Sequence, residues 1–341
     1  MSQNKEITIY DIAKSLNISP ATVSRGLKDH PAINKDTKKK IIDAAQKMGY
    51  RHNTFASNLR RQRTNILGVI VPRLNSSFTS DVIAGMEKTA NEAGFNLVIS
   101  QSLETMKKEV ANANTMFNNR VDGLLVSLAY DTTDIQHLEN FINKNIPVIF
   151  FDRVYDHEKC PSIKIDNYKA AYEITAHLIS QGCKKIAHIT GNQLRNVYQD
   201  RFNGYKQALA DHAIPLNEKH VFINDLSGKA GAETAEKILY MNDRPDGVFS
   251  ANDTCAINCM QVLMKNGISI PQDIAFAGFN NDPTSTIIEP NLTSVNYKGF
   301  EMGEVAARIL IGHLNNNYDL QLTHTLMLRH ELIMRDSSLR K

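Results

Sequence analysis

Two short helical patterns meet at a tight turn between Ile7 and Lys28, and they constrain the fold of this chain more than any other feature. The first pattern begins at Thr8, which forms with Asp11 a pair resembling a capping box. It ends at Asn17, a residue type that tolerates the left-handed backbone of a turn. Ser19 then supplies an N-cap hydroxyl, and the proline after it suits the first position of a second helix. The sequence therefore predicts two consecutive helices joined by a tight turn.

The outward side chains of the second helix are unusual for a hairpin that packs inside a core. Val23 and Leu27 share its apolar face. The other positions include Thr22, Ser24 and Arg25, short polar or cationic groups that suit base edges and phosphates. An ordinary αα-hairpin within a larger core is the alternative, and these side chains disfavour it.

Charge is divided unevenly along the chain. Residues 1–63 contain thirteen Lys/Arg and five Asp/Glu, a net charge of +8, and the remaining residues contain twenty-six and thirty-one, a net charge of −5, which together give the +3 of the whole chain. A basic head on an acidic body indicates a polyanionic partner for the N-terminal part alone. A merely solvated basic face is the alternative explanation for the charge.

A third helix and a short basic arm complete this segment. The third helix is expected from Asn34 to Met48, with Gly49 as its stop. A further helix at about residues 53–60 is too short to be stable alone. Its Leu59 lies beside Arg60, and a leucine among basic residues outside any core suits a wedge in the minor groove of DNA.

This segment resembles the DNA-binding headpiece of the LacI/GalR family of bacterial transcriptional regulators. The matching residues are Thr8 to Ala13, Ser19, Ala21 to Arg25, Gly49-Tyr50, Asn53, Ala56 and Leu59. The resemblance implies that the second helix reads the major groove of double-stranded operator DNA and that the arm enters the minor groove. The residues that we expect to contact DNA are Thr8, Tyr10, Ser19, Pro20, Ala21, Thr22, Ser24, Arg25, Asn53, Ala56, Leu59 and Arg60.

Two positions of the headpiece depart from the family pattern. His52 replaces the proline that the family usually has at the entrance to the hinge helix, so folding of the hinge is expected to differ. Gly26 replaces a larger apolar residue in the second helix, and this change should weaken that helix by up to ~1 kcal/mol.

Beyond Thr64, short apolar runs alternate with amphipathic helical patterns, which indicates parallel sheets covered on both faces. A first series of strands is expected at Ile66–Val71, Asn96–Ser100, Gly123–Ser127 and Pro147–Phe151. A second series is expected at Ser162–Ile165, Lys185–Thr190, Val221–Asn224, Gly247–Ala251 and Ile274–Gly278. Two successive series predict two similar doubly wound lobes, and ligands in such folds bind beyond the carboxyl ends of the strands.

Polar residues follow most of these strands. Taken singly, each of them suits a helix cap or a loop, because Asp, Asn and Ser are common there for local reasons. Taken together they predict a cleft rich in carboxamides, carboxylates and arginines with a few aromatic rings, which suits the hydroxyls and the ring face of a sugar. The residues that we expect to contact a ligand are Asn75, Phe78, Ser127, Asp152, Arg153, Asp166, Tyr198, Arg201, Asn252, Asp253, Asn280 and Tyr297.

The same region resembles the regulatory domain of the LacI/GalR family, which has the type I periplasmic-binding-protein fold. The matching residues are Phe151-Asp152-Arg153, Arg201 before Gly204-Tyr205, Asn252-Asp253, Gly278-Phe279, the run PNLTSV at 290–295 and Met302-Gly303. Asn280-Asn281 stands where the family usually has two aspartates, and Leu226 stands where an aromatic platform is common. Both departures disfavour a hexose bound in the commonest manner, and a different sugar is expected. A purine or a protein corepressor is the alternative.

The resemblance covers nearly the whole chain and implies a domain organisation. An N-terminal all-α helix-turn-helix headpiece, residues 1–63, precedes an α/β periplasmic-binding-protein-like (type I) regulatory domain of two doubly wound lobes, residues 64–341. The chain is expected to cross between the lobes near Ser162, Thr293 and Thr323. The N-lobe would comprise 64–162 and 294–322, and the C-lobe 163–293 and 323–341.

The short C-terminal tail, from Asp336 to Lys341, lacks a leucine-heptad extension that would form a tetramer. We therefore expect a homodimer, whose two-fold symmetry would read a pseudo-palindromic operator.

Other classes of protein fit the sequence less well. The N-terminus is polar and no stretch approaches the roughly 20 apolar residues of a membrane span, so a cytoplasmic protein without a membrane segment is expected. Four scattered cysteines, at 160, 183, 255 and 259, lack a ligand cluster, which predicts reduced thiols and neither metal nor cofactor. The motifs of common enzyme sites are missing, and we expect His177 and His188 to be structural groups. A solute-binding protein would have no use for residues 7–63. We therefore expect a sequence-specific transcriptional regulator, a repressor controlled by a small ligand, a sugar or sugar derivative, that binds between the lobes.

Overall fold

The computed structural model of the chain describes residues 7–50, 63–322 and 324–340. Its contacts divide the chain into two compact units, Met1–Thr64 and Asn65–Lys341, and each unit is described by itself. None of the helices in the described ranges combines the length and the apolar character that crossing a membrane requires.

The N-terminal unit contains three helices, α1 Ile9–Leu16, α2 Pro20–Leu27 and α3 Lys35–Met48. The expected caps are present. The Asp11 carboxylate accepts hydrogen bonds from the backbone N of Thr8 at 2.8 Å and from its Oγ1 at 2.7 Å. Asn17 has a left-handed φ of 53° at the end of α1, and Ser19 Oγ accepts from the backbone N of Thr22 at 3.1 Å at the start of α2.

The core of this unit is small and formed by all three helices. Ile12 on α1, Val23 on α2 and Ile41 on α3 are fully buried. Gly26 lies where α2 approaches α3 so closely that a Cβ at this position would overlap the Ile41 side chain. The structure therefore gives Gly26 a packing role that its low helix propensity did not reveal, because a larger residue would force Ile41 to move.

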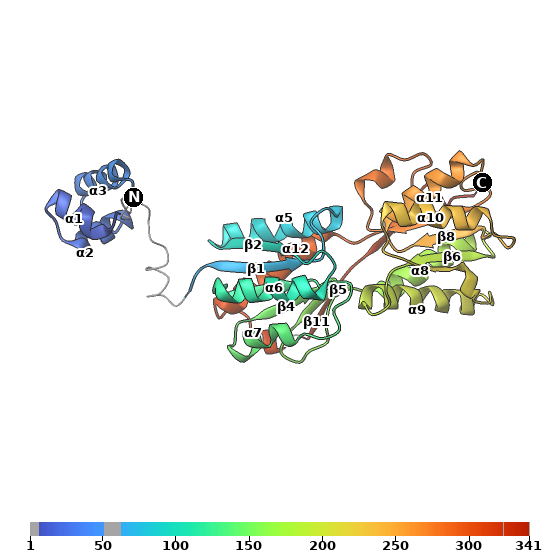
Figure 1. Ribbon diagram of the computed structural model, residues 1–341, viewed down its shortest axis with the longest axis horizontal. Helices are drawn as coiled ribbons and strands as arrows, with labels where there is room; N and C mark the ends of the chain where they lie inside the picture. The colour runs from blue at the N-terminus through green and yellow to red at the C-terminus, as the bar shows by residue number, and fades with distance from the viewer. Residues whose placement is uncertain (1–6, 51–62, 323, 341) are drawn as a thin grey trace. The chain divides into compact units, whose positions relative to one another are not determined.

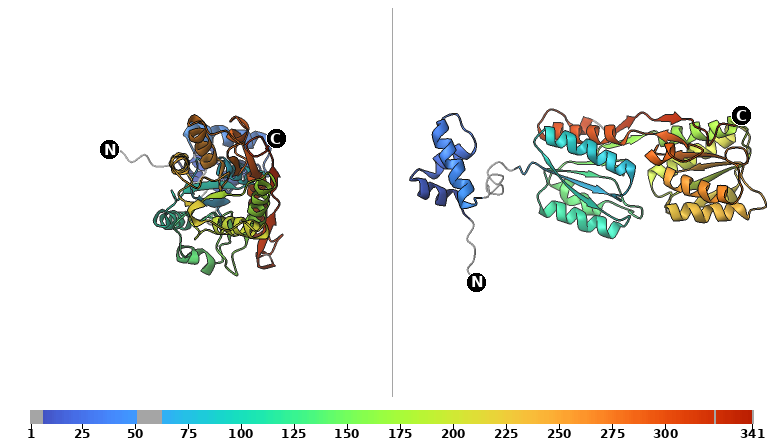
Figure 2. Two further views of the ribbon diagram at one scale, coloured as in Figure 1. Left: turned by 90° about the vertical axis from the view of Figure 1, so that its right-hand side faces the viewer. Right: turned by 90° about the horizontal axis from the view of Figure 1, so that it is seen from above.

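The first lobe of the second unit is a six-stranded parallel sheet in the order β11-β5-β4-β3-β1-β2. Its strands are β1 Ile66–Val71, β2 Asn96–Gln101, β3 Gly123–Val126, β4 Val148–Phe151, β5 Ser162–Ile165 and β11 Thr325–Leu328. Helices α5 Ser77–Glu92 and α12 Gly299–Leu314 pack together on one face, and α6 Met106–Asn118 and α7 Glu139–Asn143 cover the other (Figures 1 and 2). Helices on both faces explain why the central strands are apolar throughout.

The second lobe repeats this plan with the order β12-β10-β9-β8-β6-β7, in which only the β10–β12 pairing is antiparallel among the described strands. Its strands are β6 Ile186–Thr190, β7 Val221–Ile223, β8 Gly247–Ser250, β9 Ala275–Phe279, β10 Thr293–Asn296 and β12 Glu331–Ile333. Helices α8 Asn167–Ser180 and α9 Asn196–Asp211 pair on one face, and α10 Gly228–Leu239 and α11 Asp253–Lys265 pair on the other. Short 3-10 helices lie at Gln136–Leu138, Glu218–His220, Pro283–Thr286 and Leu320–Leu322.

The three crossings between the lobes lie a few residues later than the sequence predicted. β5, expected to begin the C-lobe series, pairs in parallel with β4 and β11 and completes the first sheet. β10, of which all but Thr293 was assigned to the N-lobe, pairs with β9 and β12 in the second sheet. β11, assigned to the C-lobe, belongs to the first sheet. The third crossing therefore lies between β11 and β12. A short apolar strand fits either sheet equally well, so its pattern does not show which sheet it joins.

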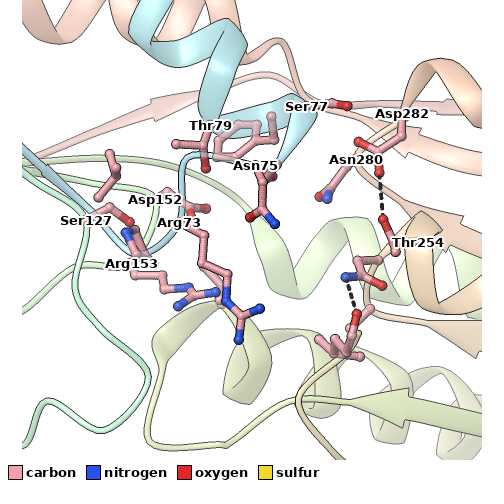
Figure 3. A pocket seen from close by; sticks show the side chains of 18 of the residues that line it. Arg73, Asn75, Ser77, Thr79, Ser127, Asp152, Arg153, Thr254, Asn280 and Asp282 are labelled. Atoms are coloured by element: carbon pink, nitrogen blue, oxygen red, sulfur yellow. Dashed lines mark hydrogen bonds between the residues drawn. The ribbon is translucent and has the colours of Figure 1, made fainter. Parts of the chain in front are cut away.

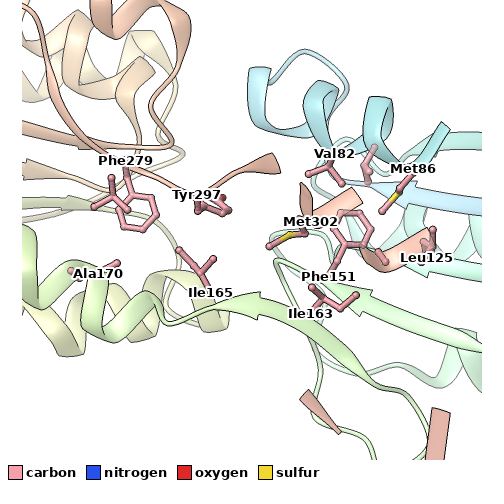
Figure 4. Packing of buried hydrophobic residues seen from close by; sticks show 14 of the residues in the cluster. Val82, Met86, Leu125, Phe151, Ile163, Ile165, Ala170, Phe279, Tyr297 and Met302 are labelled. Carbon is pink, nitrogen blue, oxygen red and sulfur yellow. The ribbon is translucent and has the colours of Figure 1, made fainter. Parts of the chain in front are cut away.

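Close helix pairs and a continuous apolar core hold the lobes in shape. α5 and α12 cross at Gly85 and Gly303, where a Cβ would meet the backbone carbonyl of Phe300 or Val82. Only glycine allows two helix backbones to approach in this way. Figure 4 shows the buried cluster, with Phe151 and Met302 in one lobe and Phe279 in the other.

Candidate functional site

A cleft of about 390 Å³ lies between the two lobes of the second unit, at the carboxyl ends of their parallel strands (Figure 3). Both lobes line it, as expected for doubly wound sheets. The first lobe contributes residues that follow β1, β2, β3 and β4, and the second contributes residues from α9 and from the segments after β7, β8 and β9. The size is within the range of small-molecule sites.

Two arginines and one glutamate form a charged cluster on the first lobe. Arg153 donates through Nη1 to Glu104 Oε2 at 2.7 Å and through Nη2 to the Tyr198 hydroxyl of the second lobe at 2.9 Å. Arg73 Nε lies 3.7 Å from the other oxygen of Glu104. The single carboxylate therefore lies between two guanidinium groups, and Arg153 is its nearer partner.

Asp152 is a partly buried carboxylate directly after β4. Its φ of 57° is left-handed, and its side chain accepts a hydrogen bond from the Tyr297 hydroxyl at 3.3 Å. Burial raises the pKa of Asp152, although the charges of Arg153 and Arg201 act in the opposite direction. A ligand hydroxyl is a suitable further donor to such a carboxylate, because it neutralises no charge and needs little space.

Arg201 on α9 forms the floor of the cleft, where its side chain is held by neighbouring groups. Its Nε donates to Asn167 Oδ1 at 2.9 Å and its Nη1 donates to the carbonyl of Ala251 at 2.7 Å. Its guanidinium stacks on the Phe279 ring, 3.5 Å from the centroid. These contacts fix the guanidinium in one orientation while Arg201 still lines the cleft.

The second lobe presents amide, hydroxyl and carboxyl groups at the other end of the cleft. Asn252 caps α11 through its Oδ1 and donates through Nδ2 to the carbonyl of Leu226 at 2.9 Å. Asn280, Thr254 and Asp282 line the cleft beside it. Burial, with a smaller contribution from the charge of Asp81, raises the pKa of Asp282 to about 6.

Aromatic rings supply the apolar part of the wall. Phe78 at the start of α5 packs against Tyr297, with ring centroids 4.3 Å apart. Tyr198 lines the cleft from α9. The faces of such rings suit the C–H face of a sugar ring, whereas the amide and carboxyl groups suit its hydroxyls.

Left-handed backbone conformations concentrate at this cleft. Glu104, Asp152, Leu226 and Asn280 line it and have φ values of 63°, 57°, 57° and 107°. Such conformations are costly for residues other than glycine and persist where the surrounding structure requires them, often at ligand sites. All four residues lie in the segments that follow the strands of the two sheets.

The cleft gathers most of the residues that the sequence assigned to a ligand. Those that line it are Asn75, Phe78, Ser127, Asp152, Arg153, Tyr198, Arg201, Asn252, Asn280 and Tyr297. Their direct contact with a ligand stays a prediction.

Asp166 and Asp253 do not line the cleft. Asp166 caps α8 by accepting from the backbone N of Lys169 at 2.9 Å. Asp253 is fully buried, and its two oxygens accept from Ser294 Oγ and from the backbone N of Asp282, both at 2.7 Å. Asp166 thus has the local cap role that its position after a strand also allowed, and Asp253 orients Asp282 instead of a ligand.

Several lining residues were not among the predicted ones. They are chiefly Arg73, Ser77, Thr79, Glu104, Asp225, Ser227, Thr254 and Asp282. Glu104 follows β2 and Asp225 follows β7, so the position of each after a strand was the signal that could have found them. Leu226, expected to replace an aromatic platform, lines the cleft with its side chain buried.

A second set of contacts joins the lobes through loops beside the cleft. We call it the interlobe clasp, and it consists of Tyr130, Thr132, Asn192, Arg195 and Asn224. The Tyr130 hydroxyl donates to the carbonyl of Asn224 at 2.9 Å and accepts from the backbone N of Asn192 at 2.6 Å. Arg195 donates through Nη2 to the carbonyl of Thr132.

Glu109 anchors the first-lobe side of the clasp. This fully buried carboxylate accepts from the backbone N of Ala129 at 2.6 Å and from Thr132 Oγ1 at 3.0 Å, and it lies 3.0 Å from Nε2 of His137. The loop that carries Tyr130 is therefore held in place before it reaches the second lobe.

In the N-terminal unit, the residues assigned to DNA occupy partly or fully exposed positions. Thr8, Tyr10, Ser19, Ala21 and Arg25 are exposed, and Pro20, Thr22 and Ser24 are partly buried. The hydroxyls of Ser19 and Thr22 lie 2.8 Å apart, so they serve the cap of α2. Asn53, Ala56, Leu59 and Arg60, with the expected hinge helix, lie outside the described residues.

The lysines at the start of α3 differ in their contacts. Lys38 Nζ lies 2.6 Å from the Asp29 carboxylate, whereas Lys39 and Lys40 are exposed. Lys38 therefore stabilises the turn before α3.

The two expected structural histidines behave as predicted. His177 on α8 lies 2.7 Å from Ser338 Oγ through its Nε2, and His188 on β6 lies 3.0 Å from the carbonyl of Phe249 through its Nδ1. Both pairs lie in the second lobe, and burial lowers the pKa of His188 to about 3. The neutral imidazole of His188 stacks on Tyr205 and Phe249 and is part of the packed core.

Comparisons with known proteins agree with this architecture. Residues 8–53 match the family of bacterial regulatory proteins of the lacI type, and residues 64–329 match the periplasmic binding proteins and sugar binding domain of the LacI family. Catabolite control protein A of Priestia megaterium is 30% identical, covering 95% of this chain and 98% of its own length. The HTH-type transcriptional regulator RegA of Clostridium saccharobutylicum is 31% identical, covering 97% and 99%. The lac repressor dimer bound to operator and the anti-inducer ONPF has a TM-score of 0.85 at 22% identity, covering 98% of this chain and 100% of the other, which shows a shared fold.

A helix-turn-helix unit followed by two periplasmic-binding-protein-like lobes defines a DNA-binding transcriptional regulator. The chain belongs to the LacI family of bacterial regulatory proteins.

Proposed function

We propose that this regulator is a homodimeric repressor whose affinity for a pseudo-palindromic operator is controlled by a sugar or sugar derivative in the interlobe cleft. The observation that carries the proposal is the chemistry of the cleft. Amide, carboxyl and guanidinium groups from both lobes surround one space, together with the ring pair of Phe78 and Tyr297. A ligand that touches both lobes stabilises one angle between them, and this supplies differential affinity for two states.

The link to DNA requires only a modest energy. A change in lobe angle would move the two N-lobes of a dimer relative to each other and alter how their hinge segments pair. A coupling of ~1–3 kcal/mol between ligand and operator is enough for regulation. A protein that acts on operator DNA in this way works in the cytoplasm, where we place it.

The hinge supplies a test of the DNA-binding mode. We expect Leu59→Ala to weaken binding to the operator while sparing binding to unrelated DNA, because a minor-groove wedge acts only at a deformed base step. Fluorescence anisotropy with both duplexes measures the two affinities. Equal weakening on both would exclude the wedge role.

The decisive experiment for the proposed function is selection of bound duplexes from random DNA, without a ligand, with a pool of sugars and with a pool of purines. We expect a pseudo-palindrome of roughly 14–20 base pairs with a flexible pyrimidine–purine step at its centre. We also expect a sugar to change its recovery. A site that responds to purines alone, or that needs a second protein, would replace the sugar with one of the alternative effectors. Failure to enrich any site under all conditions would contradict the repressor assignment.

A further inference from the structure

The guanidinium group of Arg73 can donate hydrogen bonds to a ligand in the cleft. Arg73 follows β1 and lines the cleft, and its side chain is 45% exposed. Within the described ranges, its one ion pair is the 3.7 Å approach of Nε to Glu104, too long for a hydrogen bond. Glu104 has a nearer partner, since Arg153 Nη1 lies 2.7 Å from its other oxygen. Figure 3 shows Arg73 and Arg153 extending into the same part of the cleft.

The other nearby carboxylate is also occupied. Asp225 of the second lobe lines the same cleft, and Arg73 contributes to its lowered pKa. Hydrogen bonds from Ser227 are the larger cause of that lowering, and the backbone N of Ser227 lies 3.0 Å from Asp225 Oδ1. No ion pair within 4.0 Å joins Arg73 to Asp225 among the described residues. Glu104 is therefore the one carboxylate paired with Arg73 there, and Arg153 lies closer to it.

The cleft is electrostatically unequal along its length. The guanidinium groups of Arg73 and Arg153 lie together at one end of it. The Asp282 carboxyl lies at the other end, where Figure 3 places it with Asn280 and Thr254. An anionic group is favoured beside Arg73 and disfavoured beside Asp282, whereas hydroxyls suit the end that holds Asp282.

We propose that the ligand is an acidic sugar, with a carboxylate or a phosphate bound by Arg73 and with hydroxyls directed toward Asn280 and Thr254. The planar guanidinium offers paired N–H donors that match either anion in a bidentate manner. This inference rests on the proposed function, because it names the chemical class of the effector at the same cleft.

Calorimetry on the purified full-length protein tests the proposal with matched ligands. Glucose, galactose and mannose are compared with their uronates and with their 6-phosphates. We expect at least one acidic sugar to bind about tenfold or more tightly than its neutral parent, as a charged hydrogen-bonded pair would provide. Binding of the uronates alone identifies a carboxylate as the anion, and binding of the 6-phosphates alone identifies a phosphate.

Two substitutions at the same position connect this preference to the residue. Arg73→Gln removes the charge and is expected to abolish the preference, because affinity for the acidic sugar falls to about that for its neutral parent. Arg73→Lys keeps the charge without the fork and should retain part of the preference. Arg308→Gln changes an exposed arginine on α12 and is the matched control, which should behave like the parent.

The outcomes distinguish failure of the acidic-sugar inference from failure of the proposed sugar effector. Neutral sugars that bind as tightly as the acids, or a preference that survives Arg73→Gln, would overturn the acidic-sugar inference and leave a sugar-controlled repressor standing. Binding of no sugar, neutral or acidic, by a folded protein would overturn the sugar effector itself and the inference with it. A circular dichroism spectrum of each variant checks that the variant is folded.

Discussion

Removing one oxygen from the interlobe clasp should loosen the two lobes. Tyr130→Phe keeps the ring, whose centroid lies 6.2 Å from that of Tyr198, and removes only the hydroxyl. That hydroxyl donates to Asn224 at 2.9 Å and accepts from Asn192 at 2.6 Å, so a single substitution deletes two contacts to the second lobe. The substitution leaves intact the hydrogen bonds that Glu109 accepts from Ala129 and Thr132.

The size of the effect follows from these two hydrogen bonds. Each contributes about 0.5–1.5 kcal/mol net, so their joint loss should cost the clasped arrangement about 1–3 kcal/mol. A change of this size alters the equilibrium between clasped and open lobes by about fivefold to about 150-fold. Because a ligand in the cleft contacts both lobes, its apparent affinity falls with the fraction of molecules that remain clasped.

Small-angle scattering and calorimetry measure the two consequences. We expect a larger radius of gyration for Tyr130→Phe without ligand, a return toward the parent value on saturation, and weaker ligand binding. Tyr240→Phe is the matched control, because Tyr240 is 89% exposed. If Tyr130→Phe has the parent's scattering curve and the parent's ligand affinity, the clasp does not hold the lobes together and the reasoning fails.

Three further substitutions test other parts of the structure. Arg201→Ala should destabilise the second unit by about 2–5 kcal/mol in urea unfolding and abolish ligand binding, because it removes two buried hydrogen bonds and the stack on Phe279; full stability would refute its role as the floor of the cleft. The raised pKa of Asp282, about 6 in the folded protein against a usual value of 3.8, means that the folded state binds its proton more tightly. Its stabilising contribution is therefore full below pH of about 4 and is lost as the pH rises through about 6, by about 2–3 kcal/mol, and Asp282→Asn should flatten this part of the stability profile. Gly26→Ala gains about 1 kcal/mol of helix propensity but forces Ile41 to move at a cost of about 1–3 kcal/mol, so faster hydrogen exchange in residues 7–50 is expected, and slower exchange would show that Ile41 yields freely.

The elements of this fold could be predicted from the sequence because they depend on local patterns. Continuous apolar runs such as Ile66–Val71 and the caps at Thr8 and Ser19 have one physical interpretation each, and the structure contains them. Membership of a sheet is a different matter. β5 and β11 pair with each other although about half of the chain separates them, and no local pattern records that partnership.

The residues of the cleft, like the elements of the fold, could be predicted only in part. Position after a parallel strand correctly brought Asn75, Asp152 and Asn280 to one space. The same criterion could not separate these from Asp253, because whether an aspartate faces a ligand or a backbone N–H depends on its rotamer and neighbours. The interlobe clasp was not predicted at all, since Tyr130 and Asn224 are joined only by the approach of two distant loops.

The second crossing between the lobes has a consequence for how a signal would arise. The chain leaves β10 at Asn296 and enters α12 at Gly299, and Tyr297 lies in this connection. The same tyrosine lines the cleft and donates to the Asp152 carboxylate of the opposite lobe. A molecule that displaces this hydroxyl from Asp152 therefore acts directly on a segment that connects the two lobes. Its effect on the angle between the lobes need not pass through the core of either lobe. A change in the backbone torsion angles at Tyr297 would both follow from ligand binding and rotate one lobe against the other.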